Sequence, residues 1–568
     1  MSKTFKDYLY TRPNYEEYKE TFQSRLEKLK NAEDVATARQ AIEELNVQQG
    51  TIDTMMNLYM IRFSVNMEDE FYKAEDDYWN EYLPKFEDLT TQYAKVLAET
   101  PFKGELEDAV PEPAFLLAEN QVKVFNESII ELKQEENKLS TAYNNLIASA
   151  QIEFNGKKNT LPKMVKYTTD KNRKTRKAAS EAVTSWYEEH EAEFDEIYDK
   201  MVKNRHQQAL KLGYKDYVEM SYDRMNRFGY DRKDVEKYRQ QILEYVVPVA
   251  QKLYARQAKR IGLEKMAYYD LPVGYPDGNA TPKGTTQELL AHAQKMYHEL
   301  SPETGEFFDF MLNHELLDLE TKKGKQSGGY CTFIFDEKSP YIFANYNGTS
   351  GDVDVLTHEA GHAFQVFQSQ WIKDFQLIWP TIEAAEIFSM SMEFITWPWM
   401  DGFFREETQK YKFSHLSGAL EFLPYGVLVD HFQHEVYEHP TWTPEERKAA
   451  WRKLEKLYKP ELDYSESEGL ERGIFWYRQG HIFDVPFYYI DYTLAQVVAF
   501  QFWKRFEVDK DDAALGDYLK IAKLGGTKTF LEIVAAANLK SPFEEGSLEA
   551  TILAIDDYLE NISEDVLK

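Results

Sequence analysis

The segment His358-Glu359-Ala360-Gly361-His362 constrains this chain more than any other feature of its sequence. Residues four apart lie on one face of a helix, so both imidazoles can reach the same ion while Glu359 stands beside them. Val353, Leu356 and Phe364 supply apolar positions around the segment, as a packed helix requires. The pattern therefore predicts a helix that carries two zinc ligands, with Glu359 placed to act on water as a general base.

A catalytic zinc usually takes a third protein ligand, and the next apolar segment offers three acids. Glu383, Glu386 and Glu393 lie in the stretch IEAAEIFSMSMEFITW, where a buried carboxylate needs a partner. Glu386 and Glu393 are seven residues apart and share a helix face, so one can bind the metal while the other orients a ligating histidine. Glu383 is the competing ligand. Ligand type favours zinc, although cobalt or manganese could bind the same set.

Outside this region the periodicity predicts a mainly helical protein. Apolar residues recur at three- and four-residue spacing from about Tyr15 to Leu316, and again from Val353 to the C-terminus. Between these parts, residues 328–335 and 341–346 read as two strands joined by a turn at 336–340. We therefore expect a small β-hairpin next to the predicted metal helix.

Composition excludes several classes of function. The formal net charge is -30 and no dense Lys/Arg tract occurs, which argues against nucleic-acid binding. No apolar stretch approaches the ~18 residues of a membrane span. Cys331 is the single cysteine, so no intramolecular disulfide can form, and the N-terminal residues contain no apolar core of a signal peptide. These features predict a cytoplasmic chain without membrane or nucleic-acid partners.

A second group of polar side chains lies between residues 480 and 492. It contains His481, with Tyr488, Tyr489 and Tyr492 at spacings of three and four residues. Phenol or imidazole donors could stabilise the negative oxygen that forms during peptide hydrolysis. The chain has 38 tyrosines, however, and aromatic residues at helical spacing are more often part of a core. Both interpretations stay open on residue pattern alone.

Another histidine-rich segment does not fit a metal site. In His434-Glu435-Val436-Tyr437-Glu438-His439 the histidines are five apart and lie on different helix faces. His431 and His434 could meet, but no acid follows at the spacing of a general base. We interpret these histidines as structural or as supports for the ligands of a metal.

Taken together, these segments resemble the thimet-type zinc oligopeptidases, in particular the bacterial oligoendopeptidase F branch. The resemblance is carried by Gly328 to Thr332, Val355 to Phe364, Glu386 with Glu393, and His481 with residues 488–492. It implies a mainly α, bilobed, zincin-like body with a deep central substrate channel and a small sheet beside the active site. On this view residues 1–160 form an N-terminal helical lobe and residues 161–568 the zinc region, with a cleft between them.

The resemblance also implies roles for individual residues. One zinc per chain would be held by His358, His362 and Glu386, with Glu359 activating the zinc-bound water. Glu393 and Glu383 would support the ligands. The substrate or its oxyanion would contact His481, Tyr489, Tyr492 and, close behind them, Tyr488. The hairpin would pair with the peptide backbone through a region that includes Gly328, Gly329, Tyr330, Phe343 and Asn345.

The expected activity is hydrolysis of internal bonds in short unstructured peptides. A zinc carboxypeptidase is the nearest alternative, because such enzymes also use this motif on a helical body. A non-catalytic helical peptide-binding protein is the alternative from another class, but a structural zinc site has no need of Glu359. The sequence does not indicate an oligomeric state.

Overall fold

The computed structural model describes residues 3–106 and 110–567, which are mainly helical, as predicted. The chain divides into two compact units, each built from three stretches. The first unit comprises Met1–Val122, Ala280–Thr408 and Val498–Ser541, and the second comprises Lys123–Asn279, Gln409–Val497 and Pro542–Lys568. The predicted division into lobes at residue 160 stays a prediction.

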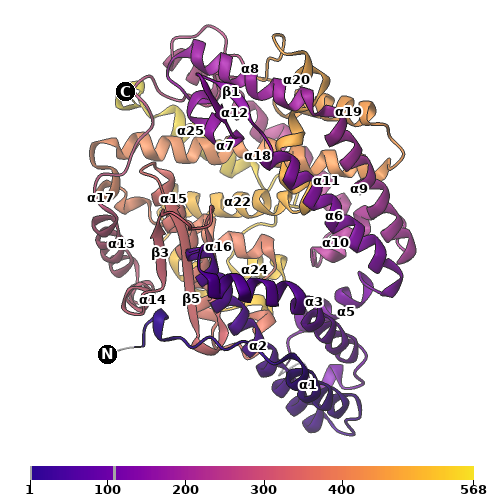
Figure 1. Ribbon diagram of the computed structural model, residues 1–568. Helices are drawn as coiled ribbons and strands as arrows, with labels where there is room; N and C mark the ends of the chain where they lie inside the picture. The colour runs from indigo at the N-terminus through magenta and orange to yellow at the C-terminus, as the bar shows by residue number, and fades with distance from the viewer. Residues whose placement is uncertain (1–2, 107–109, 568) are drawn as a thin grey trace. The chain divides into compact units, whose positions relative to one another are not determined.

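The first unit contains the predicted metal helix and the predicted hairpin (Figure 1). Its helices are α1 (Tyr15–Lys30), α2 (Val35–Val65), α3 (Glu70–Ala98), α4 (Lys103–Leu106), α5 (Glu112–Lys123), α13 (Thr286–Leu300), α14 (Pro302–Asn313), α15 (Gly351–Ser369), α16 (Ile382–Ile395), α17 (Asp401–Phe404), α23 (Ala514–Ala522) and α24 (Phe530–Ala536).

A three-stranded sheet lies in the first unit, in the order β3-β5-β4. β4 (Tyr330–Ile334) and β5 (Ser339–Tyr346) form the predicted antiparallel hairpin, and Lys338 takes a left-handed φ of 48° in the tight turn between them. β3 (Leu317–Glu320), which was not predicted, pairs with β5 in parallel. β5 is therefore the central strand, and β4 lies at an edge of the sheet.

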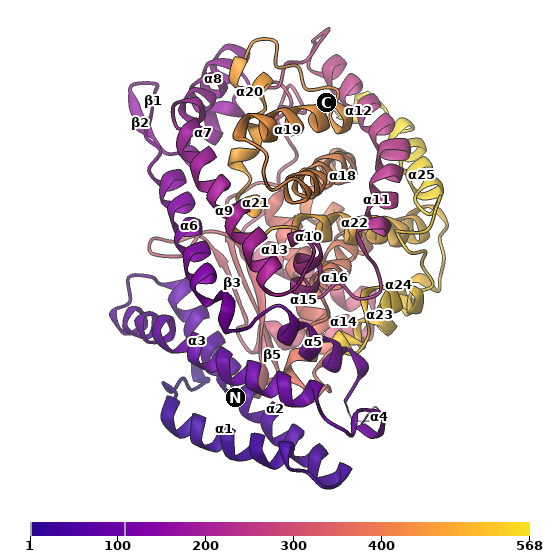
Figure 2. The same cartoon turned by 90° about the vertical axis from the view of Figure 1, so that its right-hand side faces the viewer.

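The second unit holds the remaining helices (Figure 2). They are α6 (Ile130–Ala148), α7 (Leu161–Thr168), α8 (Arg173–Glu189), α9 (Glu191–Lys211), α10 (Tyr217–Arg224), α11 (Arg232–Gln241), α12 (Val247–Arg260), α18 (Thr408–Glu438), α19 (Pro444–Tyr458), α20 (Glu468–Arg472), α21 (Gly480–Asp484) and α25 (Glu549–Glu560), while α22 (Tyr489–Trp503) contributes residues to both units. A hairpin of β1 (Ile152–Phe154) and β2 (Lys157–Asn159) completes it.

A buried ion pair links three helices of the second unit. Arg205 of α9 is fully buried, and its Nε lies 2.7 Å from Glu136 Oε1 of α6, which runs alongside α9 in Figure 2. The same guanidinium donates a hydrogen bond of 2.8 Å to the Tyr437 hydroxyl of α18. Removing one partner of this pair would leave an uncompensated buried charge, which costs about 3–5 kcal/mol.

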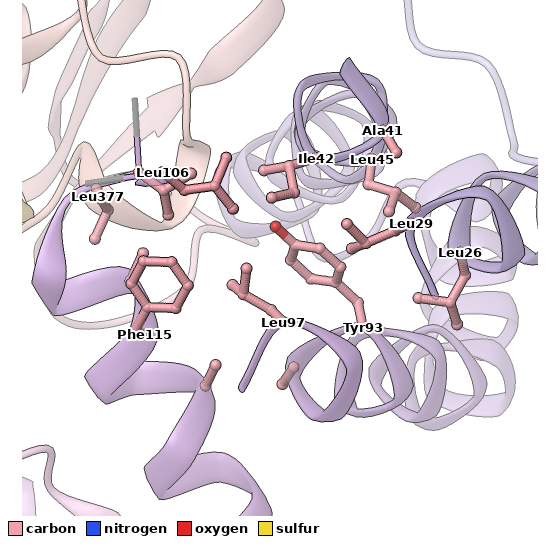
Figure 3. Packing of buried hydrophobic residues seen from close by; sticks show 14 of the residues in the cluster. Leu26, Leu29, Ala41, Ile42, Leu45, Tyr93, Leu97, Leu106, Phe115 and Leu377 are labelled. Carbon is pink, nitrogen blue, oxygen red and sulfur yellow. The ribbon is translucent and has the colours of Figure 1, made fainter. Parts of the chain in front are cut away.

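The first unit has a continuous apolar core between its N-terminal helices and the segment that follows α15. Figure 3 shows the Tyr93 ring of α3 among Ile42, Leu45 and Leu97, with Leu377 at the other end of the cluster. Leu45 and Phe115 are 0% exposed. N-terminal helices therefore support the segment that leads from α15 into α16.

None of the helices within the described residues combines the length and the apolar composition that a membrane span requires.

Candidate active site

The predicted metal motif lies in the middle of α15, directly after the central strand β5. Asp352 fixes the start of this helix, because its carboxylate accepts hydrogen bonds from the backbone N–H groups of Asn347 (2.9 Å) and Gly348 (2.8 Å) in the preceding turn. One helical turn separates His358 from His362, and their ring centroids are 5.0 Å apart. The spacing therefore places both imidazoles on one face, as predicted.

Gly361 allows α16 to approach the motif closely. A Cβ atom at this position would lie 2.5 Å from the Phe388 carbonyl oxygen and 2.6 Å from Ser389 Cα, both on α16. Such distances are far shorter than ordinary van der Waals contacts, so only glycine fits here. The close contact brings the carboxylate of Glu386, on the same helix, to the two histidines.

We expect Gly361→Ala to destabilise the protein and to weaken metal binding. The added methyl group must push α15 and α16 apart, which costs about 1–3 kcal/mol in a packed core. Chemical denaturation would measure the free energy of unfolding. Gly418→Ala in α18 is the matched control, because Gly418 is exposed and its Cβ would meet no atom within 4 Å, so alanine there should be neutral or stabilising. Equal effects of the two substitutions would contradict the close-packing argument.

His358, His362 and Glu386 form a cluster with metal-site geometry. One ligand atom from each lies within 4.8 Å of the others. Glu386 Oε2 is 3.3 Å from His358 Nε2 and 3.5 Å from His362 Nε2. Zinc bonds of about 2.0–2.2 Å at tetrahedral angles place ligand atoms about 3.3–3.6 Å apart, so the residues fit a zinc ion. Among the described residues this is the one such group of three.

The carboxylates around this cluster are held in place by hydrogen bonds. Glu393 Oε1 lies 2.7 Å from His358 Nδ1, which orients the ring so that Nε2 faces Glu386. Ser389 donates a hydrogen bond of 2.9 Å to Glu386 Oε2. Burial would raise the pKa of Glu386, but the two imidazoles hold it well below its ordinary value. Glu383 is 0% exposed and lies outside the ligand group.

Glu359 stands beside this cluster in a nearly buried position. It is 9% exposed, and burial raises its pKa although the histidines oppose the shift. A carboxylate with a raised pKa is a stronger base than one in water. Burial raises the pKa of the Cys331 thiol of β4, and the negative charge of Glu359 raises it further. A Cβ at Gly329, directly before this strand, would lie 3.7 Å from Val355 of α15, so the edge strand lies near the motif.

The residues that were predicted to bind the peptide lie on β4, on β5 and in the loop before β4. The Tyr330 and Phe343 rings stack at 4.9 Å, and Phe343 is fully buried, so its ring supports Tyr330. Asn345 donates hydrogen bonds of 2.8 Å to the carbonyl oxygens of Gln326 and Gly328 and so shapes the loop before β4. Gly328 has a φ of 95°, which favours glycine.

His481 of α21 and the three tyrosines that were grouped with it from the sequence lie in the second unit. Ring centroids of Tyr488, Tyr489 and Tyr492 lie 5.7, 4.9 and 6.3 Å from that of His481. The structure therefore brings these four residues together. Burial raises the pKa of Tyr489 to about 12 and lowers that of His481. The phenol of Tyr489 is thus a proton donor at neutral pH, and the imidazole is neutral.

The family model described as peptidase family M3 matches residues 166–552, and that of the peptidase M3 N-terminal domain matches residues 5–125. The first of these matches covers more than half of the chain.

The chain belongs to peptidase family M3.

Relatives of this M3 chain include oligoendopeptidase F proteins. The oligoendopeptidase F homolog of Borreliella burgdorferi is 25% identical over 328 residues, which cover 56% of this chain and 54% of that relative. PZ peptidase A, solved with an inhibitor, is 48% identical and superposes with a TM-score of 0.90 over 99% of this chain and 100% of that one. A protein of Bacillus anthracis str. Ames, provisionally described as an oligoendopeptidase F, is 48% identical with a TM-score of 0.85 over 99% of both chains.

Family M3 comprises zinc metallopeptidases, and the chain belongs to its oligoendopeptidase F branch, as the resemblance implied. The mainly α fold is likewise confirmed.

The remaining histidines of the M3 chain do not form a second metal group within the described residues. His434 Nε2 lies 3.4 Å from Asp430 and 3.1 Å from the Tyr222 hydroxyl, and His431 Nδ1 lies 3.0 Å from the Tyr458 hydroxyl. Their interpretation as structural or supporting residues stays a prediction.

Sequence reasoning missed Ser389, which donates to Glu386 in the first unit, and Gln479, which contacts His481 in the second. Ser389, three residues after Glu386, could have been found from its helical spacing. Gln479, which contacts His481, left no signal beyond its nearness in sequence.

Proposed function

We propose that this protein is a zinc endopeptidase that hydrolyses internal bonds of short, unstructured peptides. The single observation that carries the proposal is the cluster of His358, His362 and Glu386 with Glu359 beside it. Membership in family M3 supports the peptidase class. Residue roles, the zinc ion and the class of substrate are parts of the proposal.

The three ligands fit one zinc ion per chain. In this proposal Glu393 orients His358, and Glu383 lies buried on α16, the helix that also carries Glu386 and Glu393. A bound zinc ion supplies Lewis-acid chemistry, which polarises a carbonyl oxygen and lowers the pKa of water to about 7. Within this site, Glu359 takes the proton of the attacking water and then gives it to the leaving amine. Its nearly buried position suits a base that must hold a proton between the two steps.

The edge strand β4 is the proposed binding site for the peptide backbone. Among the described residues, β4 pairs with β5 on one side, and no other backbone hydrogen bond reaches it. An extended peptide could add to such an edge as a further strand. A Cβ at Gly329 would lie 3.3 Å from the Phe343 carbonyl oxygen, so a side chain there would crowd the sheet. Gly328, Tyr330 and Asn345 shape the same edge.

His481 and Tyr489 are the proposed donors to the substrate oxygen, with Tyr492 and Tyr488 packed against them. The neutral imidazole of His481 and the protonated phenol of Tyr489 support this role, because a hydrogen-bond donor stabilises the developing oxyanion.

The proposal also includes a cytoplasmic location. Cys331 is the single cysteine, which suits a reducing compartment.

Product analysis on a peptide of roughly ten residues, blocked at both ends, tests the reaction class. We expect cleavage at an internal bond, read by mass spectrometry, because the proposed edge strand recognises backbone rather than a chain end. A zinc carboxypeptidase would leave the blocked peptide intact and shorten its unblocked counterpart one residue at a time. That pattern would replace the endopeptidase proposal with the carboxypeptidase.

A further inference from the structure

Three side chains of the second unit form a chain of hydrogen bonds that ends on His481. The Tyr425 hydroxyl of α18 lies 2.6 Å from Gln479 Oε1. The amide nitrogen Nε2 of Gln479 lies 2.8 Å from His481 Nδ1. Neither Tyr425 nor Gln479 belongs to the groups assigned above to the metal or to the substrate.

The Gln479 amide turns its oxygen toward Tyr425 and its nitrogen toward His481. A separation of 2.6 Å is ordinary for O–H···O but short for N–H···O, so the atom facing Tyr425 is the amide oxygen. Burial raises the pKa of Tyr425, which keeps its hydroxyl protonated and able to donate. The amide nitrogen must then face His481.

This orientation decides which nitrogen of His481 carries the proton. Because an amide N–H donates to Nδ1, that nitrogen must accept, and the proton of the neutral ring lies on Nε2. We propose that Gln479, held by Tyr425, is a positioning residue that keeps His481 in the tautomer with a proton on Nε2. The ring then donates a hydrogen bond to the carbonyl oxygen of the peptide substrate. This inference rests on the proposed function of His481.

The opposite tautomer would be inactive in this role. It would present a lone pair to the substrate oxygen, and losing one such donor costs about 10²–10³ in rate in other hydrolases. The groups that face His481 are the three phenols of Tyr488, Tyr489 and Tyr492, and Asp484 on its own helix. Asp484 accepts hydrogen bonds from Ser140 and Asn144. Burial lowers the pKa of His481, and the charge of Asp484 opposes that shift. Among the described residues, Gln479 is therefore the hydrogen-bond partner of Nδ1.

Nitrogen NMR on the full zinc-loaded protein with labelled histidine tests the tautomer without any change at Gln479. His481 is assigned by the signal that disappears in His481→Gln. We expect Nε2 to give the shift of a protonated ring nitrogen and Nδ1 that of an unprotonated one at neutral pH. A proton on Nδ1 would overturn the proposal. This result does not depend on turnover, so failure of the proposed function, seen as absent hydrolysis, is distinguishable from failure of the tautomer assignment.

The pH profile of Gln479→Glu tests the link to activity. In the wild type both the imidazolium and the neutral ring carry a proton on Nε2, so titration of His481 leaves the donor in place. A carboxylate at position 479 accepts from Nδ1–H and raises the pKa of His481, so deprotonation removes the Nε2 proton instead. We expect kcat to fall by up to about 10²-fold as pH rises through that pKa.

Gln240→Glu is the matched control for this experiment, because Gln240 is exposed on α11 and the substitution adds the same charge. Its pH profile should follow that of the wild type. A loss of kcat in Gln479→Glu that is the same at every pH would indicate a merely structural role and would overturn the proposal.

Discussion

Replacing Glu359 with glutamine should lower kcat by about 10²–10⁴-fold while zinc stays bound, because general acid–base catalysis contributes about that much. The amide keeps the shape of the side chain but cannot take a proton from water. Glu359 is 9% exposed and its pKa is raised by burial, so a neutral amide should leave the free energy of unfolding unchanged or increase it. Steady-state kinetics, metal analysis and chemical denaturation of one preparation measure all three effects.

Glu306→Gln provides a charge-matched control for this variant. Glu306 is exposed on α14, in the same unit as α15, and its substitution should leave kcat unchanged. If Glu359→Gln kept turnover comparable with that of the control, Glu359 would not be the base. If it lost its zinc, the residue would belong to the metal site and not to the proton transfer.

Removing the Glu386 carboxylate should have the largest effect on metal binding. Loss of a residue that only orients a ligand costs about 10–100-fold in metal affinity, and loss of a ligand should exceed that. Glu386→Ala should therefore release zinc to a chromophoric chelator that the wild type resists, and its hydrolysis should fall in step with bound metal. Competition titration measures the affinity directly.

Glu383→Ala tests which of the two candidate carboxylates of α16, Glu383 or Glu386, binds the metal. Glu383 lies one turn before Glu386 and outside the ligand cluster, so its removal should leave zinc affinity closer to that of the wild type. The reverse ranking of the two variants would assign the third ligand to Glu383. Glu306→Ala controls for the loss of an acidic side chain in general.

Helical spacing was sufficient to predict the two imidazoles, because four residues on a helix decide their common face without any tertiary information. It could not choose among Glu383, Glu386 and Glu393, since all three lie on an apolar helix and the choice depends on how α16 meets α15. The packing of the two helices depends on Gly361, because the absence of a side chain there allows the α16 backbone to approach α15 closely. Glycine in a helix carries no such signal in sequence.

The prediction of the strands was limited in the same way, because pairing between distant segments leaves no local pattern. The hairpin of β4 and β5 was predicted from two apolar runs and the turn between them. β3 was missed because four residues that pair in parallel with a distant strand have no turn of their own. The β1–β2 hairpin was also missed, although Asn155 and Gly156 both have positive φ, as a tight hairpin turn requires.

Contacts around His481 also came from tertiary structure. The sequence grouped His481 with three tyrosines by spacing within one segment. Tyr425 lies 54 residues before Gln479, so nothing in the local pattern linked them. The state of the imidazole could be inferred only once both hydrogen bonds were known.

The most direct test of the account is a zinc titration of the metal-free protein. Hydrolysis of a quenched fluorescent peptide, blocked at both ends, would be followed as zinc is added. We predict no hydrolysis without metal and a linear rise that ends at one zinc per chain. Full hydrolysis by the metal-free chain, or one bound zinc without hydrolysis, would contradict the account.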